Sequence, residues 1–463
     1  MSHLEATWWQ PLSPKQPSGE RSVVAADSGS SLAFWALVAF TAILLLSPQA
    51  WLPALKIVRI AFLAAGLAMA AHVAERTIHR QSITPLSPEI GIVLALVAWA
   101  VLTLPLSMWP GGSVRVLTDH YLKAIAFFWL LGTIVTSTHR LRAMAWTLVL
   151  CSVPLAATGV VNYLSGATLS TGVRGFYRIE GYVGQGGSGL TGNPNDLALM
   201  LNLIVPLAGV LAFVSRGVRR LVAIAALLLA VLAIVLTFSR AGFMTLAASF
   251  VMFLVVLTRR KAAGAAAALL VLAICIPPLL PAGYVDRLST ITNIEADRTG
   301  SAQGRWRDIQ EAAEVVAKNP VVGAGIGNDI LAMNVQRGDD WTQVHNVYLQ
   351  YGVDLGIPGL LLFAWLHLLC YRTARAVEKR SAKQGTNRDL TLLAAGIQVS
   401  LVAFLVAAMF HPIAYQFYFF SIGGLAVALR NIWHAEAGVG HGLGNSLGTS
   451  LGTNRASLAG SGS

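Results

Sequence analysis

Gly304-Arg305-Trp306-Arg307-Asp308 opens a polar segment that closes at Val344-His345-Asn346-Val347-Tyr348, and long apolar runs lie on both sides of it. Lipid offers no hydrogen-bonding partners, so the backbone of a polar segment between apolar spans must lie in water or in a cavity. Residues 283–345 are therefore predicted to form a large loop outside the bilayer, while most of the remaining chain lies within it.

The composition of the 463-residue chain indicates an integral membrane protein. Hydrophobic residues make up 55% and charged residues 12%, whereas soluble domains have about 25% charged residues. The net charge of +12 comes from short basic clusters between apolar runs, which are typical of topology signals and do not favour a nucleic-acid partner. Cys151, Cys275 and Cys370 lie in apolar stretches without paired spacing, so we expect buried thiols.

Apolar runs long enough to cross a bilayer recur along the chain. One helical crossing needs about 20 residues, and this length predicts an all-α protein with about twelve transmembrane helices. Between an N-terminal tail (1–31) and a flexible, Gly- and Ser-rich C-terminal tail (436–463), the membrane domain (32–435) has outer loops at about 165–193 and 283–345. The predicted centres of the spans are Ala39, Gly66, Ala98, Phe127, Leu150, Ile204, Leu229, Phe250, Leu270, Leu360, Val399 and Tyr418.

Basic residues cluster in every second connection between the predicted spans. Cytoplasmic connections of membrane proteins are enriched in Lys and Arg. Both termini are therefore predicted to be cytoplasmic, with the two long loops on the opposite side. The clusters are Arg76 and Arg80; Arg140 and Arg142; Arg216, Arg219 and Arg220; Arg259, Arg260 and Lys261; and Arg372, Arg375, Lys379, Arg380, Lys383 and Arg388.

The larger loop is predicted to contain a surface helix from about Arg305 to Lys318, which Asn319-Pro320 ends. Four apolar residues recur at helical spacing and are expected to form its apolar face. They are Trp306, Ile309, Ala313 and Val316.

Two polar motifs are interpreted as structural. Asn193-Pro194-Asn195-Asp196 is expected to cap the sixth span. Gly323, Gly325 and Gly327 are similar to a nucleotide-binding loop, but they follow a helix and no strand precedes them, so a tight turn is expected. The adjacent pair Asp339-Asp340 is a poor metal site on its own, and no cluster of His, Asp or Cys indicates one.

Arg240 is the first candidate site residue, in the turn Ser239-Arg240-Ala241-Gly242 between two apolar runs. The structural alternative is an interfacial arginine that snorkels and fixes helix depth. Topology requires no cation on this side of the membrane, however. A guanidinium on the wall of a cavity at membrane depth is suited to bind a phosphate bidentately.

The larger loop supplies the other candidates. Arg305 and Arg307 point in different directions on a helix, because adjacent positions differ by about 100°. Arg307 has Glu311 as an ion-pair partner and is better explained as part of a solvated face. Arg305, nearer the helix start where backbone N–H groups favour anions, is the better phosphate ligand.

His345 and the first outer loop complete the set of candidates. His345 is either a hydrogen-bonded interfacial residue or a general base, because its pKa near neutrality suits removal of a proton from a hydroxyl. Arg174, Arg178 and Glu180 of the first outer loop are weaker candidates for lining the same cavity.

At these residues the sequence resembles the O-antigen ligase and O-antigen polymerase superfamily, and most closely O-antigen ligase. The resemblance covers about residues 190–370 and implies a helical bundle in the bacterial inner membrane, with a periplasmic loop between the ninth and tenth spans. The matching motifs are Ser239-Arg240-Ala241-Gly242, Gly304-Arg305-Trp306, Asn319-Pro320, Gly323-Ala324-Gly325-Ile326-Gly327, His345-Asn346-Val347-Tyr348, Gly352 and Gly356-Ile357-Pro358-Gly359.

The resemblance also implies an activity in lipopolysaccharide assembly. The donor would be a glycan on undecaprenyl pyrophosphate, and the acceptor a sugar hydroxyl of lipid A–core. By the same resemblance Arg240 and Arg305 hold the pyrophosphate, and His345 activates the acceptor for an inverting attack. Arginines can stabilise a departing pyrophosphate without a divalent ion, so neither a metal nor another cofactor is expected.

Two kinds of alternative remain. One is a polymerase of O-antigen or exopolysaccharide, or a protein O-oligosaccharyltransferase, from the same superfamily; the absence of a large additional C-terminal region favours a ligase. The other is a transporter or flippase of a lipid-linked glycan. An asymmetric outer loop with a histidine favours an enzyme, whereas paired broken helices in two repeated halves would favour a transporter.

Overall fold

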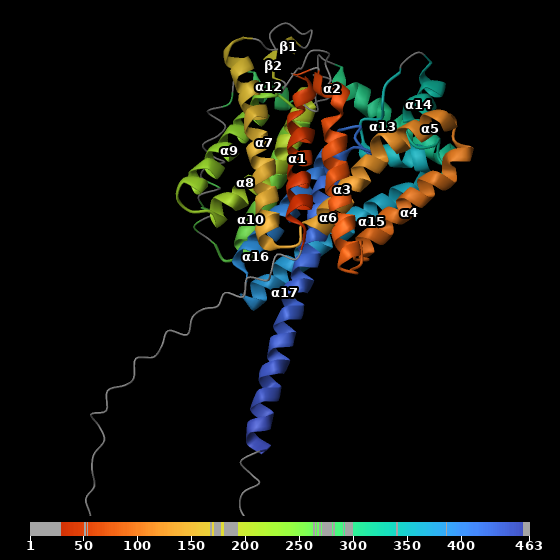
Figure 1. Cartoon of the computed structure of the whole chain (residues 1–463). Coiled ribbons are helices and arrows are strands. Elements are labelled where there is room, and N and C mark those ends of the chain that lie inside the picture. The colour runs from red at the N-terminus through yellow and green to blue at the C-terminus, as the bar shows by residue number, and fades with distance from the viewer. Residues whose placement is uncertain are drawn as a thin grey trace, which may run out of the picture.

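The computed structural model describes residues 29–456, except for 51, 53, 167–168, 171–176, 180–192, 263, 265, 268–269, 271–279, 281–282, 290, 292–299, 339–340 and 386. The described elements form a bundle of helices, with α13, α14 and α5 and a small strand pair at one end (Figure 1). The strands β1 (Leu169–Ser170) and β2 (Tyr177–Arg178) have two residues each and pair antiparallel. The predicted all-helical architecture is confirmed for this part of the chain.

The helices follow the apolar runs of the sequence. They are α1 (Ser31–Leu46), η1 (Pro48–Ala50), α2 (Ala54–Val58), α3 (Ile60–Ile78), α4 (Pro88–Thr103), η2 (Leu104–Leu106), α5 (Pro110–Val116), η3 (Leu117–Tyr121), α6 (Leu122–Ile134), α7 (Thr138–Leu164), α8 (Pro194–Val214), α9 (Gly217–Leu236), α10 (Arg240–Arg259), α12 (Tyr284–Ser289), α13 (Ser301–Lys318), α14 (Asp329–Arg337), α15 (Val347–Gln384), α16 (Arg388–Ala407) and α17 (Phe417–Ala456).

Within the described ranges, seven helices are long and apolar enough to cross a membrane: α4 continued to Leu106, α7, α8, α9, α10, α15 and α16. α1 is a shorter apolar helix. Eleven of the twelve predicted span centres fall inside described helices, and the twelfth, Leu270, is flanked by residues outside them. The total of twelve spans therefore stays a prediction.

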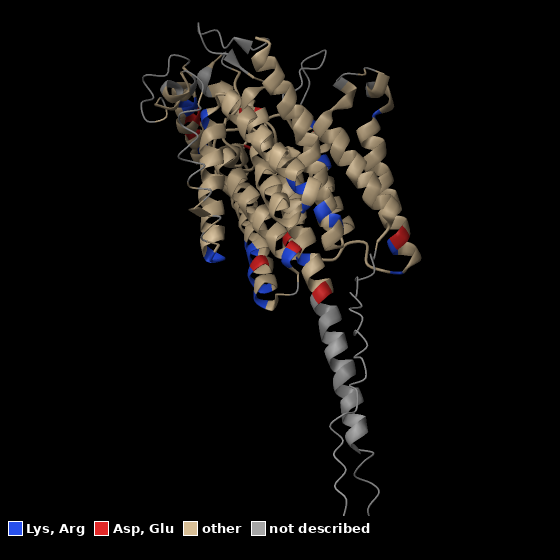
Figure 2. Ribbon diagram, turned by 90° about the vertical axis from the view of Figure 1, so that its left-hand side faces the viewer, with Lys and Arg blue, Asp and Glu red and all other residues tan. Residues whose placement is uncertain are grey.

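Polar contacts join most of the basic connections at the same end of the bundle. Many of the ribbon positions of Lys and Arg lie at that end in Figure 2. This arrangement agrees with the alternation of basic clusters along the sequence. The contacts are Arg140 with Gly29, Arg142 with Asp389, Thr138 with Glu436, and Arg260 with Glu378 and Thr391.

The structure describes only part of the two predicted tails. Residues 1–28 of the N-terminal tail lie outside the described residues. α17 continues as a helix to Ala456, past the predicted start of the C-terminal tail at residue 436. The division into tails and membrane domain stays a prediction. Cys151 and Cys370 are buried free thiols, as expected, and Cys275 lies outside the described residues.

α15 is broken near its start at Gly356, where φ is 68° and ψ is −174°. The chain after α13 packs into the break. Ala324 N–H donates to the Val353 carbonyl at 2.7 Å, and Ile357 N–H donates to the Pro320 carbonyl at 2.7 Å. A helix broken within a membrane protein needs such partners for its freed backbone groups.

The glycine run after α13 is a tight turn, as predicted. Gly323, Gly325 and Gly327 have φ values of 73°, 97° and 73°, a region that only glycine adopts without cost. A Cβ at Gly325 would lie 2.1 Å from the Ser107 hydroxyl oxygen, so the turn also needs glycine for close packing. The turn therefore serves the broken helix and not a nucleotide.

Replacing Gly356 by alanine is expected to lower the stability of the protein strongly. The added Cβ would lie 2.2 Å from the Val321 carbonyl oxygen, and the positive φ adds strain. We expect a loss of about 2 kcal/mol or more in the free energy of unfolding, measured as a lower thermal midpoint in detergent. Gly66→Ala in α3, with no atom within 4 Å of the added Cβ, is the matched control. Equal midpoints for the two variants would contradict this account.

Candidate functional site

A pocket of about 160 Å³ lies between the start of α10, the helix α13 and the turn from α16 to α17. Arg240, Arg305 and His345 all line it, although they come from three separate segments of the chain. The other lining residues are Ala241, Met244, Ile291, Ala302, Trp306, Asp308, Ile309, Val344, Asn346, Met409 and Phe410. The structure thus brings together the three residues that the sequence singled out first.

Arg240 is held by the capped start of α10, of which it is the first residue. It is only 9% exposed. The Ser239 hydroxyl caps the helix by accepting from Gly242 N–H at 3.1 Å, and it donates to the Asn195 side-chain oxygen at 2.8 Å. Serine is among the residues preferred at this capping position. The backbone that carries the Arg240 guanidinium is therefore fixed next to α8.

The start of α8 is capped as the sequence predicted. The Asn193 side chain accepts from Asn195 N–H at 2.8 Å. A Cβ at Gly242 would lie 2.7 Å from the Ala198 Cβ, so glycine at this position allows α10 to approach α8 closely. The close approach of α10 to α8 therefore explains the glycine of the Ser239–Gly242 motif.

α13 turns a different face inward from the one predicted. Its buried residues are Asp308, Ala312 and Val315, at 8%, 0% and 5% exposure, whereas Trp306 and Ile309 are 55% and 37% exposed. Consecutive helical positions differ by about 100°, so the predicted apolar face was wrong by about one residue. The physical reason is that Ala312 and Val315 pack in a hydrophobic cluster with the turn after α13, α14 and α15, while Asp308 has a partner inside the protein.

Arg305 lies on the pocket side of α13, but not at its start. The helix ends at Lys318 as predicted, yet it begins at Ser301, so Arg305 is one turn further along. The free backbone N–H groups belong to the first turn of a helix. The prediction that the start of the helix assists Arg305 in binding an anion is therefore wrong. The proposed role of Arg305 depends on its position in the pocket.

His345 is paired with Asp308 across the pocket wall. His345 Nδ1 lies 3.1 Å from Asp308 Oδ2. The carboxylate accepts the Nδ1–H and so leaves the lone pair on Nε2, which is the arrangement a general base requires. Sequence reasoning gave Asp308 no role, although its position three residues after Arg305 places both on one helical face.

The backbone around His345 is fixed on both sides. Val344 N–H donates to Asp329 Oδ2 at 3.1 Å, and burial raises the pKa of Asp329, which is 1% exposed. Asn346 caps α15 by accepting from Tyr348 N–H at 2.9 Å. Val347 N–H donates to the Ala408 carbonyl at 2.8 Å. The imidazole therefore projects from a rigid start of a helix.

His411 links the turn between α16 and α17 to α8. Its Nδ1 lies 2.8 Å from the Ala407 carbonyl and its Nε2 lies 3.2 Å from the Asn195 carbonyl. Burial lowers the pKa of His411 to about 4, and the charges of Arg305 and His345 act in the same direction. His411 thus positions the turn whose Met409 and Phe410 line the pocket.

Of the remaining predicted site residues, only Arg307 has a side chain that the structure describes. Arg307 is exposed and lies outside the set of lining residues. Arg174, like Glu180 and Asp339-Asp340, lies outside the described residues, and the side chain of Arg178 is not described either. Among the described residues, no three His, Cys, Asp or Glu side chains are grouped so that they could hold a metal ion.

Together these features define a multi-pass helical membrane protein with a buried arginine and a histidine–aspartate pair in one pocket. Residues 225–364 match the model of the O-antigen ligase family, so the predicted resemblance to the O-antigen ligase superfamily is confirmed over this stretch. The family comprises ligase- and polymerase-type membrane enzymes resembling glycosyltransferases, and the matched residues include Arg240, Arg305, Asp308 and His345. No curated protein matches the chain.

Proposed function

We propose that the protein is an O-antigen ligase, a metal-independent, inverting glycosyltransferase. It would move a glycan from undecaprenyl pyrophosphate to a sugar hydroxyl of lipid A–core. The observation that carries the proposal is the meeting of Arg240, Arg305 and the His345–Asp308 pair in one pocket. All four residues lie in the stretch that matches the O-antigen ligase family.

The pocket supplies the groups that this reaction needs. His345 Nε2 takes the proton of the acceptor hydroxyl, and the hydroxyl oxygen attacks the anomeric carbon from the face opposite the pyrophosphate. The bond to the pyrophosphate oxygen breaks, and the anomeric configuration inverts. Arg240 and Arg305 stabilise the negative charge that develops on the leaving group, and Asp308 stabilises the imidazolium.

The size of the pocket fits the reacting groups and not the whole substrates. A volume of 160 Å³ equals about five water molecules at roughly 30 Å³ each. The pyrophosphate can enter such a space, whereas the lipid tail and the glycan must extend outside it. This division suits an enzyme that recognises the linkage more closely than the sugars beyond it.

The proposed topology has twelve spans, cytoplasmic termini and the pocket at the periplasmic surface of the inner membrane. The grouping of basic connections at one end of the bundle supports it, because basic residues favour the cytoplasmic side. The residues of the pocket lie in the other set of connections, which alternate with the basic connections along the chain. Arg174 and Arg178 of the first outer loop remain proposed contacts to the donor.

The test is a transfer assay with purified protein, an undecaprenyl-pyrophosphate glycan and lipid A–core, in the presence of EDTA. We expect a glycan–core product. Lengthened lipid-linked glycans without that product would identify a polymerase, and neither product from folded protein would favour a transporter. Activity that EDTA removes and a divalent ion restores would refute metal independence.

Replacing Asp308 by asparagine is expected to slow transfer roughly 10- to 100-fold, part of the 10²- to 10⁴-fold that a general base contributes. The amide cannot stabilise the imidazolium or hold the same tautomer as firmly. Initial rates at saturating acceptor measure the effect. Arg307→Ala, an exposed residue two positions from Arg305 on the same helix, is expected to keep near wild-type rates. Equal losses in the two variants would contradict the roles assigned to them.

A further inference from the structure

A second and larger pocket, of about 310 Å³, lies between α15 and α17. Its basic residues come from both helices: Arg372 and Arg380 from α15, and Arg430 and His434 from α17. Arg372 and Arg380 are exposed. Guanidinium groups on two helices that face one cavity are suited to bind a phosphate, because each can donate two parallel hydrogen bonds.

The rest of the pocket is apolar. Leu369, Val377 and Trp433 line it next to the arginines, and Val377 and Trp433 are buried. A pocket of this kind fits an amphiphile, with a phosphate at the basic residues and hydrocarbon along the apolar wall. A free phosphate ion would leave the apolar part unused.

Arg430 is fixed in place by a buried acid. Glu89 of α4, at 0% exposure, lies 2.8 Å from Arg430 Nη2, which also donates to the Thr373 hydroxyl at 3.0 Å. This contact joins α4, α15 and α17 behind the pocket. It neutralises one of the three arginine charges and leaves those of Arg372 and Arg380.

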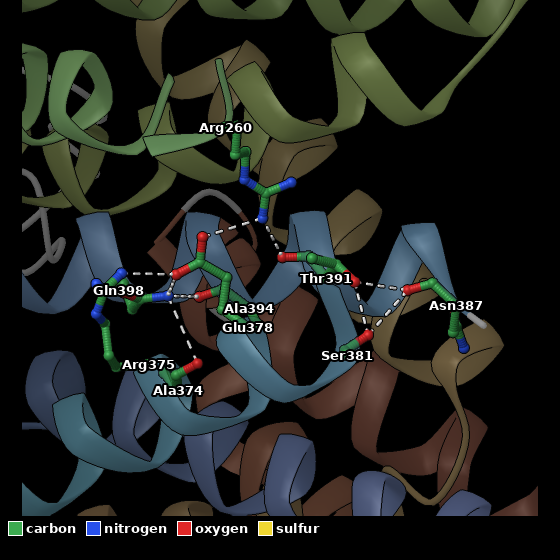
Figure 3. Close-up of polar contacts among 9 residues, drawn as sticks. All are labelled: Arg260, Ala374, Arg375, Glu378, Ser381, Asn387, Thr391, Ala394 and Gln398. Carbon is green, nitrogen blue, oxygen red and sulfur yellow. Dashed lines mark hydrogen bonds and ion pairs between the residues drawn. The ribbon is translucent and has the colours of Figure 1, made fainter. Parts of the chain in front are cut away.

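Glu378, the acid of α15 closest in sequence to Arg380, is bound by other partners. Glu378 accepts from Arg260 at 3.2 Å, from Arg375 at 3.1 Å and from Gln398 at 2.9 Å, as Figure 3 shows. Neither Arg372 nor Arg380 has an ion-pair partner among the described residues. The pocket therefore keeps a net positive charge.

The pocket lies at the end of the bundle where the basic connections gather. Arg260, in the connection after α10, contacts Glu378, two residues before Arg380, and Arg142 contacts Asp389 after α15. Clusters of Lys and Arg are typical of the cytoplasmic surface of a membrane, so the basic rim is at the height of the lipid headgroups.

We propose that this pocket binds the phosphate headgroup of an anionic phospholipid of the surrounding membrane. Arg372 and Arg380 bind the phosphate, while an acyl chain lies along Leu369 and Trp433. Basic pockets between transmembrane helices at such a surface recognise anionic headgroups in this way. The bound lipid would join α15 and α17 at the end of the bundle opposite the first pocket.

The test is native mass spectrometry of the full-length protein with phosphatidylglycerol or phosphatidylcholine. Wild type is expected to retain phosphatidylglycerol selectively, and R372Q/R380Q to bind it roughly tenfold more weakly. R219Q/R220Q removes two exposed arginines from the start of α9 and is expected to bind as wild type does. Equal retention by the two double variants, or no preference of wild type for phosphatidylglycerol, would overturn the proposal.

Two further readouts separate this site from a soluble-anion site and from a folding defect. Phosphatidylglycerol is expected to raise the thermal midpoint of wild type and of R219Q/R220Q but not that of R372Q/R380Q, because a ligand stabilises the state that binds it. All three proteins should share one midpoint without lipid. Displacement of the lipid by millimolar inorganic phosphate would identify a soluble-anion site and overturn the assignment to a lipid.

Discussion

Replacing His345 by alanine is expected to lower the rate of glycan transfer by about 10²- to 10⁴-fold, the range a positioned general base contributes. The carboxylate of Asp308, which the change leaves in the pocket, is a weaker base than an imidazole. His411 has both ring nitrogens at backbone carbonyls. Single-turnover rates with saturating donor and acceptor measure the chemical step alone.

A binding measurement distinguishes loss of the base from loss of the pocket. His345→Ala should retain affinity for the lipid-linked donor, because Arg240 and Arg305 are unchanged. His139→Ala, an exposed histidine at the start of α7, is the matched control and should transfer at the wild-type rate. If His345→Ala kept more than about a tenth of the rate, His345 would not be the base.

The apolar helices could be predicted from the sequence because one physical requirement determines them. A helix that crosses a bilayer needs about 20 apolar residues whatever its neighbours are. α8 and α16 illustrate this: both follow largely apolar runs, and both are long and apolar enough to cross. The break at Gly356 was not predicted, because its partners are the carbonyl of Pro320 and the turn that follows it.

The site was partly predictable for a related reason. Arg240 and His345 stood out because charged or titratable groups at the ends of apolar spans need a partner or a purpose. Arg305 stood out because it lies near the start of the predicted loop helix, where backbone N–H groups favour anions. Asp308 did not stand out, since an acid on a polar helix is usually solvated. Its partner His345 is 37 positions away, and only the tertiary structure brings them together.

The prediction of the inward face of α13 was wrong for the same reason. Trp306 and Ile309 gave the stronger local pattern, but hydrophobic periodicity carries no information on a distant imidazole. His411 was overlooked in the same way, because its contact with Asn195 spans 216 positions. Local sequence patterns therefore predicted the helices and singled out the unusual residues. The contacts between residues that are distant in the sequence required the tertiary structure.

Replacing Arg240 by lysine is expected to slow transfer roughly 10²- to 10³-fold, nearly as much as replacing it by glutamine. The two changes differ in charge but share the loss of the planar fork that grips a phosphate with two parallel hydrogen bonds. Lysine offers a point charge at a backbone position that the Ser239 cap fixes. Rates and donor affinity, measured separately, should show a larger loss in rate than in affinity, because the charge to be stabilised grows in the transition state.

The double variant Arg240→Gln/His345→Ala provides the sharper test. If the arginine stabilises the leaving pyrophosphate while the histidine removes the acceptor proton, both act on one transition state, and their effects should combine to less than the product of the single losses. Independent multiplication of the losses would mean that Arg240 acts on another step, such as donor entry. A rate of Arg240→Lys close to wild type would mean that charge alone suffices, and the bidentate contact would have to be assigned to Arg305.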